Sequence, residues 1–218
     1  MENSEIVLAE LARLYPDARP ALHYSTAYEL LVAVILSAQC TDERVNLVTE
    51  KLFVGHNTPE RMLLLSQEEL EKYIFSCGLY RSKAKHILSA SKDIVEKFGG
   101  EVPSTIEGLR SLAGVGQKTA NVVYSVAFGG DAIAVDTHVF RVSNRLGLAH
   151  ADTPARTEEQ LRAVIPQKDW SKAHHWLIFH GRRVCHSRNP DCAVCTLKGE
   201  CVYFASRANP VTDRKISE

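Results

Sequence analysis

The spacing of hydrophobic residues predicts a chain built from helices. Ile6, Leu8, Leu11 and Leu14 recur at helical intervals ahead of two prolines, which predicts a helix over residues 4–15. Residues 27–38 are apolar on nearly every side, as is typical of a central buried helix. No segment alternates between hydrophobic and polar residues over the length of a strand, so we expect an all-α fold of about ten helices.

Local capping signals divide this pattern into elements. Thr26 with Glu29 has the form of a capping box, in which each side chain bonds the other's backbone N–H group. Further helix starts are predicted at Thr58-Pro59, Ser66 with Glu69, Ser104 with Glu107, and Thr153-Pro154. Glycines mark the ends at Gly78, Gly99, Gly100, Gly114, Gly116, Gly129 and Gly130.

Composition is that of an ordinary globular protein. The 218 residues, 45% of them hydrophobic, suffice for one large domain or two small ones with a real core. The longest uncharged apolar run, residues 30–38, is well short of the roughly 18 residues of a membrane span, so no membrane association is expected. Residues 1–5 lack the basic and apolar regions of a secretory signal, and we expect a cytoplasmic protein.

The charges balance overall, but they are unevenly distributed. Lys and Arg together number 26, as do Asp and Glu, yet residues 161–218 contain 10 basic and 5 acidic side chains. This basic excess permits nucleic-acid binding without demonstrating it, since a solvated charged face would have the same composition.

Two glycines separated by one residue form a candidate hairpin between predicted helices at 104–111 and 117–128. Gly114-Val115-Gly116 allows positive φ angles and brings backbone N–H groups close to a ligand at a helix N-terminus, where an anion such as phosphate is favoured. The alternative is a tight turn whose glycines only cap a helix and clear space. The glycines alone do not decide between these interpretations.

Lys118 lies in the first turn of the second helix, where the positive end of the helix dipole disfavours a cation. That field, together with partial burial, would favour the neutral amine, which is a nucleophile for a carbon electrophile. A surface lysine that contacts phosphate or water is the alternative.

Asp136 ends the apolar stretch 132–135 and stands at the predicted N-cap of a helix that runs to about residue 146. A helix cap worth about 1 kcal/mol is the simpler interpretation. A carboxylate partly buried at this position would also suit the stabilisation of a developing positive charge or the transfer of a proton.

Four of the six cysteines fall within a short segment near the C-terminus: Cys185, Cys192, Cys195 and Cys201. In a reducing compartment such a cluster is more typical of a metal site than of disulfides. Only one pair has the two-residue spacing of a zinc knuckle, and zinc and a 4Fe-4S cluster fit this spacing equally well. Cys40 and Cys77 are isolated, and we expect them to be small buried hydrophobic residues.

Taken together, the chain resembles the endonuclease III family of helix-hairpin-helix DNA glycosylases. Four motifs, occurring in family order over nearly the whole chain, support the resemblance: residues 37–42, 112–121, 135–138 and the cysteine spacing. Ala113 replaces a proline common in the family and Gln117 replaces a basic residue, which puts in doubt only the stiffness of the hairpin and its affinity for DNA.

The resemblance implies a bifunctional glycosylase and abasic-site lyase of base excision repair. The partner of such an enzyme is double-stranded DNA that contains a damaged base or an abasic site. The enzyme removes oxidised pyrimidines and then breaks the strand at the abasic site by β-elimination. Lys118 matches the family's nucleophile, which forms a Schiff base with C1′, and Asp136 matches its catalytic carboxylate. Gly114, Val115 and Gly116 would bind the DNA backbone, and His138 would contact DNA near the site.

The family's architecture has two helical domains with a DNA-binding cleft between them. It implies a six-helix domain at 22–131 and a second domain, formed by 1–21 plus 132–218, that binds one 4Fe-4S cluster through the four cysteines. Gln39 and Leu79 match residues that fill the gap left by the flipped nucleotide. The alternatives are a polar helix end for Gln39 and a residue anchoring its loop for Leu79. We expect a monomer in the cytoplasm, associated with the nucleoid.

Two other functions remain open at this level. A monofunctional glycosylase of the same superfamily would lack the lysine at position 118 and would usually carry a further C-terminal domain, whereas Cys201 lies close to the end of this sequence. A non-catalytic DNA-binding protein could use the hairpin for phosphates and the cysteine loop as a metal clip. The nine histidines, including His174 and His175, have no assigned role beyond the burial of one or two of them.

Overall fold

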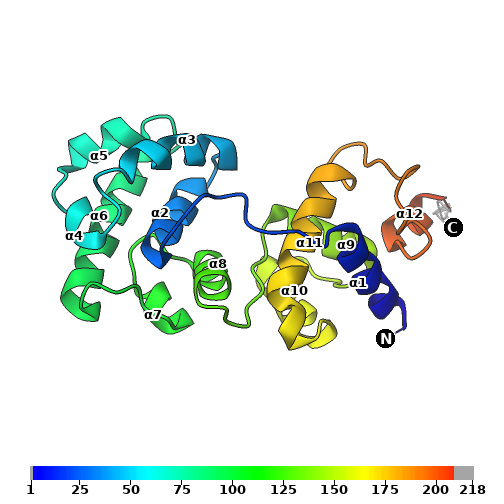
Figure 1. Ribbon diagram of the computed structural model, residues 1–218. Helices are drawn as coiled ribbons and strands as arrows, with labels where there is room; N and C mark the ends of the chain where they lie inside the picture. The colour runs from blue at the N-terminus through cyan, green and yellow to red at the C-terminus, as the bar shows by residue number, and fades with distance from the viewer. Residues whose placement is uncertain (1, 209–218) are drawn as a thin grey trace, which may run out of the picture. The chain divides into compact units, whose positions relative to one another are not determined.

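The computed structural model describes residues 2–208, and every regular element in this range is a helix (Figure 1). The N-terminal half contains α1 (Glu2–Leu14), α2 (Ala27–Ser37), α3 (Asp42–Leu52), α4 (Pro59–Met62), α5 (Gln67–Ile74), α6 (Tyr80–Phe98) and α7 (Ile106–Arg110). The C-terminal half contains α8 (Gln117–Ala127), α9 (Thr137–Leu146), α10 (Pro154–Val164), the 3-10 helix η1 (Gln167–Asp169), α11 (Trp170–Arg183) and α12 (Val202–Ala208). The all-α prediction is confirmed, and none of these helices is long and apolar enough to span a membrane.

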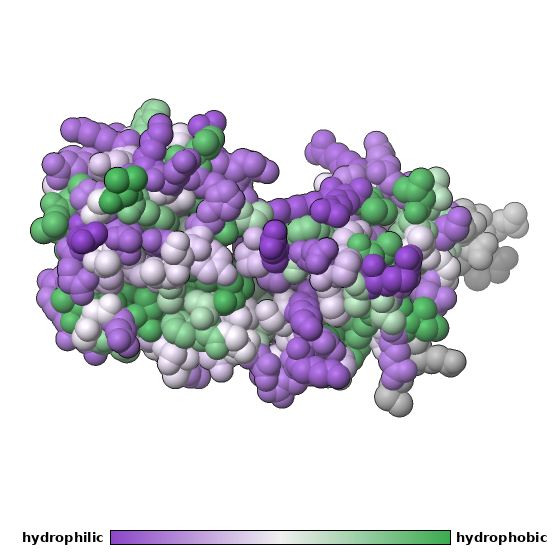
Figure 2. Space-filling view, in the orientation of Figure 1, coloured by the Kyte–Doolittle hydropathy of each residue, from purple (hydrophilic) through white to green (hydrophobic). Residues whose placement is uncertain are grey.

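The chain divides into two compact units. The first, here called the terminal unit, combines residues 1–19 with 135–218, and the second, the central unit, is the continuous segment Pro20–Ala134. In each unit the visible surface is mostly hydrophilic, with hydrophobic residues in small groups (Figure 2).

The core of the central unit is built around α2. All residues from Tyr28 to Leu36 are buried, and α2 packs against α3, α6 and α8. Burying each large aliphatic side chain contributes about 1.5–3 kcal/mol, which explains why an apolar helix takes the central position. The predicted central buried helix is therefore confirmed.

Most of the predicted caps form, with two differences of detail. Ser66 and Glu69 form the complete capping box, and the Thr26 hydroxyl accepts from the Glu29 N–H group. Glu29 itself accepts from the N–H group of Ser25, one residue earlier than a capping box requires. The expected start at Ser104 is wrong by one residue, because Thr105 caps α7 by accepting from the Gly108 N–H group.

The core of the terminal unit forms where α11 packs against α1 and α9. In α1 the buried stripe runs through Val7 and Leu11, while Ile6 is 48% exposed, so the predicted stripe was rotated by about one residue. Three histidines of α11 are buried: His174, His175 and His180. Burial lowers the pKa of His175 to about 3 and that of His180 to about 4, which keeps both rings neutral near neutral pH.

Candidate active site

The glycine hairpin of the central unit connects α7 to α8, and its two glycines play different parts. Gly114 has φ +76°, and a Cβ atom at this position would lie 2.7 Å from the Cβ of His86, so only glycine fits. Gly116 is the N-cap of α8 with an extended backbone, and a Cβ added there would meet nothing within 4 Å. Open space in front of a helix N-terminus suits the approach of a phosphate.

Val115, between the glycines, faces inward. Its side chain is 7% exposed and its N–H group donates to the carbonyl of Leu112 at 3.2 Å. Val115 therefore anchors the hairpin to the core, and the N–H groups in the first turn of α8 are the donors nearest to the open side of Gly116.

Lys118 occupies the second position of α8, directly after this opening, and is exposed. The partial burial expected from the sequence is not observed. The neighbouring Gln117 donates to the Asn121 side chain at 2.9 Å, and the buried Asn121 donates to the carbonyl of Ile133 at 2.9 Å. These bonds fix the first turn of α8, in which Lys118 itself is exposed.

Asp136 is the N-cap of α9 in the terminal unit, as predicted. Its carboxylate accepts from the Val139 N–H group at 2.7 Å, and the side chain is half-buried. The capping bond orients the carboxylate, while the remaining exposed part leaves an oxygen lone pair available for chemistry.

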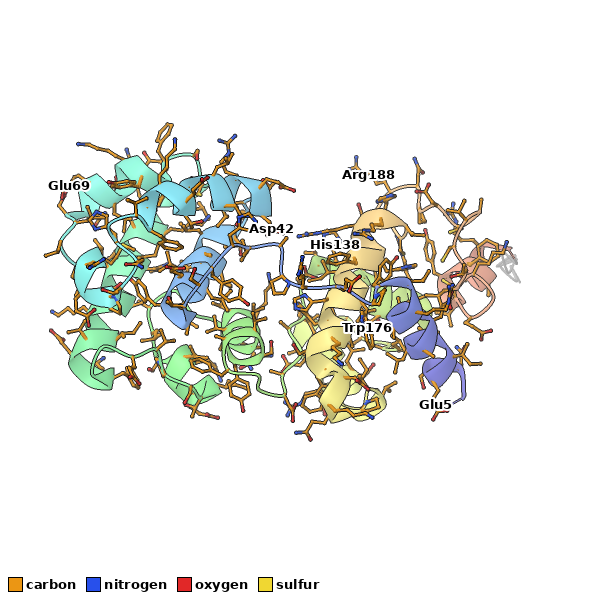
Figure 3. The ribbon with its side chains drawn as sticks, in the orientation of Figure 1. Glu5, Asp42, Glu69, His138, Trp176 and Arg188 are labelled. Carbon is orange, nitrogen blue, oxygen red and sulfur yellow. The ribbon has the colours of Figure 1, made fainter. Side chains whose placement is uncertain are left out.

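His138, labelled in Figure 3, lies in the first turn of α9 and is held from within the terminal unit. The Arg141 guanidinium approaches its Nδ1 atom at 3.1 Å. Because a guanidinium only donates, Nδ1 is the acceptor and the ring is neutral; burial also lowers the pKa of His138. His138 thus forms part of an internal network, and its predicted contact with DNA stays a prediction.

Arg141 ties the start of α9 to the cysteine segment. Its Nε and Nη2 atoms donate to the carbonyl of Cys185 at 3.2 and 3.1 Å, and Nη2 also donates to the carbonyl of Gly181 at 3.0 Å. The sequence does not predict this connection, because the bonds span 40 and 44 positions and end on backbone atoms.

Gln39 and Leu79 lie in the central unit with left-handed backbones. Their φ angles are +55° and +58°, values that non-glycine residues rarely adopt. Both side chains are exposed, Leu79 by 60%. Leu79 is therefore not an anchor beneath its loop, and an exposed leucine at the N-cap of α6 has the form of an apolar wedge.

The four C-terminal cysteines line one pocket in the terminal unit. The Cys195 sulfur accepts from the backbone N–H group of Leu197, and the Cys201 sulfur accepts from those of Tyr203 and Phe204. Burial has the larger effect on both thiols and raises the pKa of each. Among residues 2–208, no group of three or more His, Cys, Asp or Glu side chains is arranged to hold a metal ion.

Cationic and neutral donors also face these sulfurs. Arg145 donates to the Cys185 sulfur at 3.4 Å and to the carbonyls of His186 and Ser187, and its guanidinium lies over the Tyr203 ring. The His180 ring lies between the Tyr15 hydroxyl at 2.9 Å and the Cys195 sulfur at 3.7 Å. Four thiols with N–H donors and a guanidinium fit an anionic iron-sulfur group, because such donors stabilise thiolate ligands.

Comparison with known proteins gives a consistent result. A family profile described as HhH-GPD superfamily base excision DNA repair protein matches residues 32–167. The chain is 50% identical to endonuclease III of Rickettsia conorii over 87% of its own length and 90% of the relative, and 50% identical to endonuclease III of Bacillus subtilis over 92% of both. Its fold matches a solved trapped covalent intermediate of endonuclease III with DNA, with a TM-score of 0.90 and 46% identity over 95% of this chain and 99% of that one.

Proposed function

This chain belongs to the HhH-GPD superfamily of base excision DNA repair proteins, and within it to the endonuclease III family, and we propose that Lys118 is its catalytic nucleophile. The chain is a bifunctional DNA glycosylase and abasic-site lyase of base excision repair. The observation that supports the proposal best is the exposed Lys118 amine in the first turn of α8, immediately after the open glycine hairpin.

The proposed reaction begins when a damaged nucleotide leaves the DNA stack. The neutral Lys118 amine attacks C1′ of the deoxyribose, the glycosidic bond breaks, and the base departs with a proton. The sugar ring then opens: the C1′–O4′ bond breaks, O4′ takes up a proton, and a protonated Schiff base joins the lysine nitrogen to C1′. This Schiff base acidifies the C2′ proton, whose removal expels the 3′ phosphate by β-elimination. Asp136 stabilises the positive charge that develops on the sugar and transfers protons.

Binding of the substrate is assigned to the hairpin and the two left-handed residues. The backbone at Gly114 and Gly116 and the first turn of α8 receive a phosphate, while Gln39 and Leu79 occupy the gap in the duplex. Oxidised pyrimidines are the proposed substrates. Since the substrate is duplex DNA, we expect the protein in the cytoplasm with the nucleoid, acting as a monomer.

The four C-terminal cysteines are proposed to bind one 4Fe-4S cluster, which would act as a structural clip for the loop at 185–201. The donor set described above supports iron, and an absorbance band at about 400 nm in the purified protein distinguishes a cluster from colourless zinc. A spectrum without this band, together with one equivalent of zinc, would remove the cluster from the proposal and leave the role of Lys118 intact.

Incision of an abasic-site duplex tests the proposed chemistry. We expect wild-type protein to leave a 3′ end with an unsaturated sugar aldehyde, and Lys118→Gln to cut at least about 1,000-fold more slowly, since the nucleophile is lost. Full activity in Lys118→Gln would reject the assignment. A protein that releases bases without cutting the strand would be the monofunctional alternative, and one that only binds DNA would be the non-catalytic alternative.

Asp136→Asn provides the matched test of the carboxylate. Asparagine caps helices as well as aspartate does, so α9 and the unfolding free energy should be preserved while the charge is removed. We expect base release to fall by about 10²-fold or more with little change in thermal stability. Unchanged base release would reduce Asp136 to a helix cap.

A further inference from the structure

The two left-handed residues of the central unit belong to neighbouring loops. Gln39 follows α2 and precedes Asp42, which is labelled in Figure 3, whereas Leu79 is the N-cap residue of α6. The loops touch through their backbones, since a Cβ atom on Gly78 would lie 3.3 Å from the carbonyl oxygen of Gln39. Cys40 and Cys77, which flank these positions, also share a side-chain hydrogen bond.

The loop after α2 is a type II turn. Ala38 has φ −59° and ψ 114°, Gln39 has φ +55°, and the Cys40 N–H group closes the turn on the carbonyl of Ser37 at 3.1 Å. A type II turn differs from the commoner type I turn by a flip of its central peptide, which here joins Ala38 to Gln39. The third turn residue favours glycine, so glutamine holds this conformation at a cost in free energy.

Lys83 is placed to fix that central peptide. Its side chain is 4% exposed, and its Nζ atom donates to the carbonyl of Ala38 at 2.7 Å and to the carbonyl of Leu36 at 2.8 Å. The first of these carbonyls is the one that reverses between the two turn types. The second lies in the last turn of α2, where the helix dipole favours a cation.

Lys83 is also part of the element that presents Leu79. It lies in the first turn of α6, and its N–H group donates to the carbonyl of Leu79 at 3.0 Å. Burial lowers the pKa of Lys83, so burying its side chain carries a desolvation cost that the two carbonyl bonds offset. An ammonium enclosed in this way is unavailable as a nucleophile, in contrast to the exposed Lys118.

We propose that Lys83 is a positioning residue, whose bond to the Ala38 carbonyl holds the turn in its type II form and thereby aims Gln39 beside Leu79 for insertion into DNA. This inference rests on the proposed function only for the task of the two side chains; the turn geometry is independent of it. Pre-organising both residues before DNA binds lowers the entropy lost when the nucleotide is extruded.

The structural part is tested with Lys83→Met, which keeps the length of the side chain and removes the donor. We expect a crystal structure of this variant to show the Ala38–Gln39 peptide flipped and Gln39 at a negative φ. A type II turn that persists with Gln39 near +55° would overturn the proposal, whatever the enzyme does to DNA.

The functional part is tested with a double-mutant cycle between Lys83→Met and Gln39→Ala. The probe is a duplex containing a tetrahydrofuran abasic analogue, compared with an undamaged duplex of the same sequence. We expect Lys83→Met to reduce the preference for the analogue about tenfold, and to reduce it less than about twofold when Gln39 is already alanine. An equal loss in both backgrounds would mean a general structural role and would overturn the proposal.

Controls separate this result from other failures. Lys92→Met removes an exposed lysine of the same helix, α6, and should behave as wild type. Circular dichroism of each variant establishes that it is folded at the assay temperature. If wild-type protein cuts no abasic site, the proposed function fails; if wild-type protein cuts normally and Lys83→Met keeps the full preference, only the role of Lys83 fails.

Discussion

Arg141 donates two hydrogen bonds to the carbonyl oxygen of Cys185, from Nε at 3.2 Å and from Nη2 at 3.1 Å. This arginine stands five residues after the proposed catalytic Asp136, and the cysteine is the first of the four that we assign to the cluster. The helix that presents the carboxylate and the loop that contains the cysteines are therefore joined by one side chain within the terminal unit. A cluster bound by the four cysteines would hold the loop that Arg141 binds, and would support the position of α9 through this connection.

Replacing Arg141 should loosen the loop. We expect Arg141→Met to lower the unfolding free energy by about 2–4 kcal/mol, because it leaves buried carbonyls without a charged donor. Arg141→Lys should not restore stability, since one ammonium cannot reproduce the planar fork. Denaturant unfolding of the two variants checks this, together with the rate at which absorbance at about 400 nm is lost in air.

Arg13→Met serves as the control for this series, because its ion pair with Glu10 is on the surface and its loss should change stability little. Equal stability of the Arg141 and Arg13 variants would contradict the structural role given to Arg141.

The two hairpin glycines should respond to substitution in opposite ways. Gly114→Ala should destabilise the protein by about 2 kcal/mol or more, because it forces a left-handed alanine against His86. Gly116→Ser should leave stability unchanged or raise it by up to about 1 kcal/mol, since serine is a good N-cap and the space is open. Thermal unfolding measures both effects.

DNA binding should also be affected by the substitution at Gly116. The serine side chain of Gly116→Ser occupies the space proposed for a phosphate, so affinity for duplex DNA should fall even though the protein is as stable as wild type. Unchanged affinity would show that DNA does not approach at this glycine.

Buried His175 should make the protein less stable in acid. Its pKa in the folded state is lowered to about 3, chiefly by burial, so between pH 6.5 and that value the unfolded chain binds one proton more than the folded chain. The unfolding free energy should therefore be highest above pH 6.5 and fall by up to about 1.4 kcal/mol per pH unit below it.

His175→Leu tests the source of this slope. In this variant the unfolding free energy should fall less steeply below pH 6.5, by up to about 1.4 kcal/mol per pH unit. Urea unfolding at a series of pH values between about 6.5 and 4 measures the difference. The same slope in His175→Leu would mean that other groups, such as His180, cause the acid sensitivity.

Local signals in the sequence predicted local structure well. The Ser66 cap, the Asp136 cap and the central apolar helix each depend on a few neighbouring residues, and each is present. The motifs near Lys118 and the cysteines were equally visible, since chemistry there requires particular residue types at fixed spacing.

Features that depend on distant backbone atoms were not predictable. Nothing near Lys83 in the sequence indicates that its amine bonds the carbonyls of Leu36 and Ala38, and nothing near Arg141 points to Cys185. Every residue has a backbone carbonyl, so neither composition nor spacing indicates which carbonyl a distant side chain will bond. The left-handed conformation of Gln39 was missed for the same reason, because a distant lysine holds it.

Borohydride trapping of the reaction intermediate shows whether Lys118 is the residue that bonds to the sugar. Reduction during the reaction with abasic-site DNA converts a Schiff base into a stable amine, so a covalent protein–DNA adduct should accumulate, and mass spectrometry of its peptides should locate the modification at Lys118. We expect this adduct in wild-type protein and none in Lys118→Ala. An adduct of equal yield in Lys118→Ala, or one mapped to another lysine or to the N-terminal amine, would contradict this expectation.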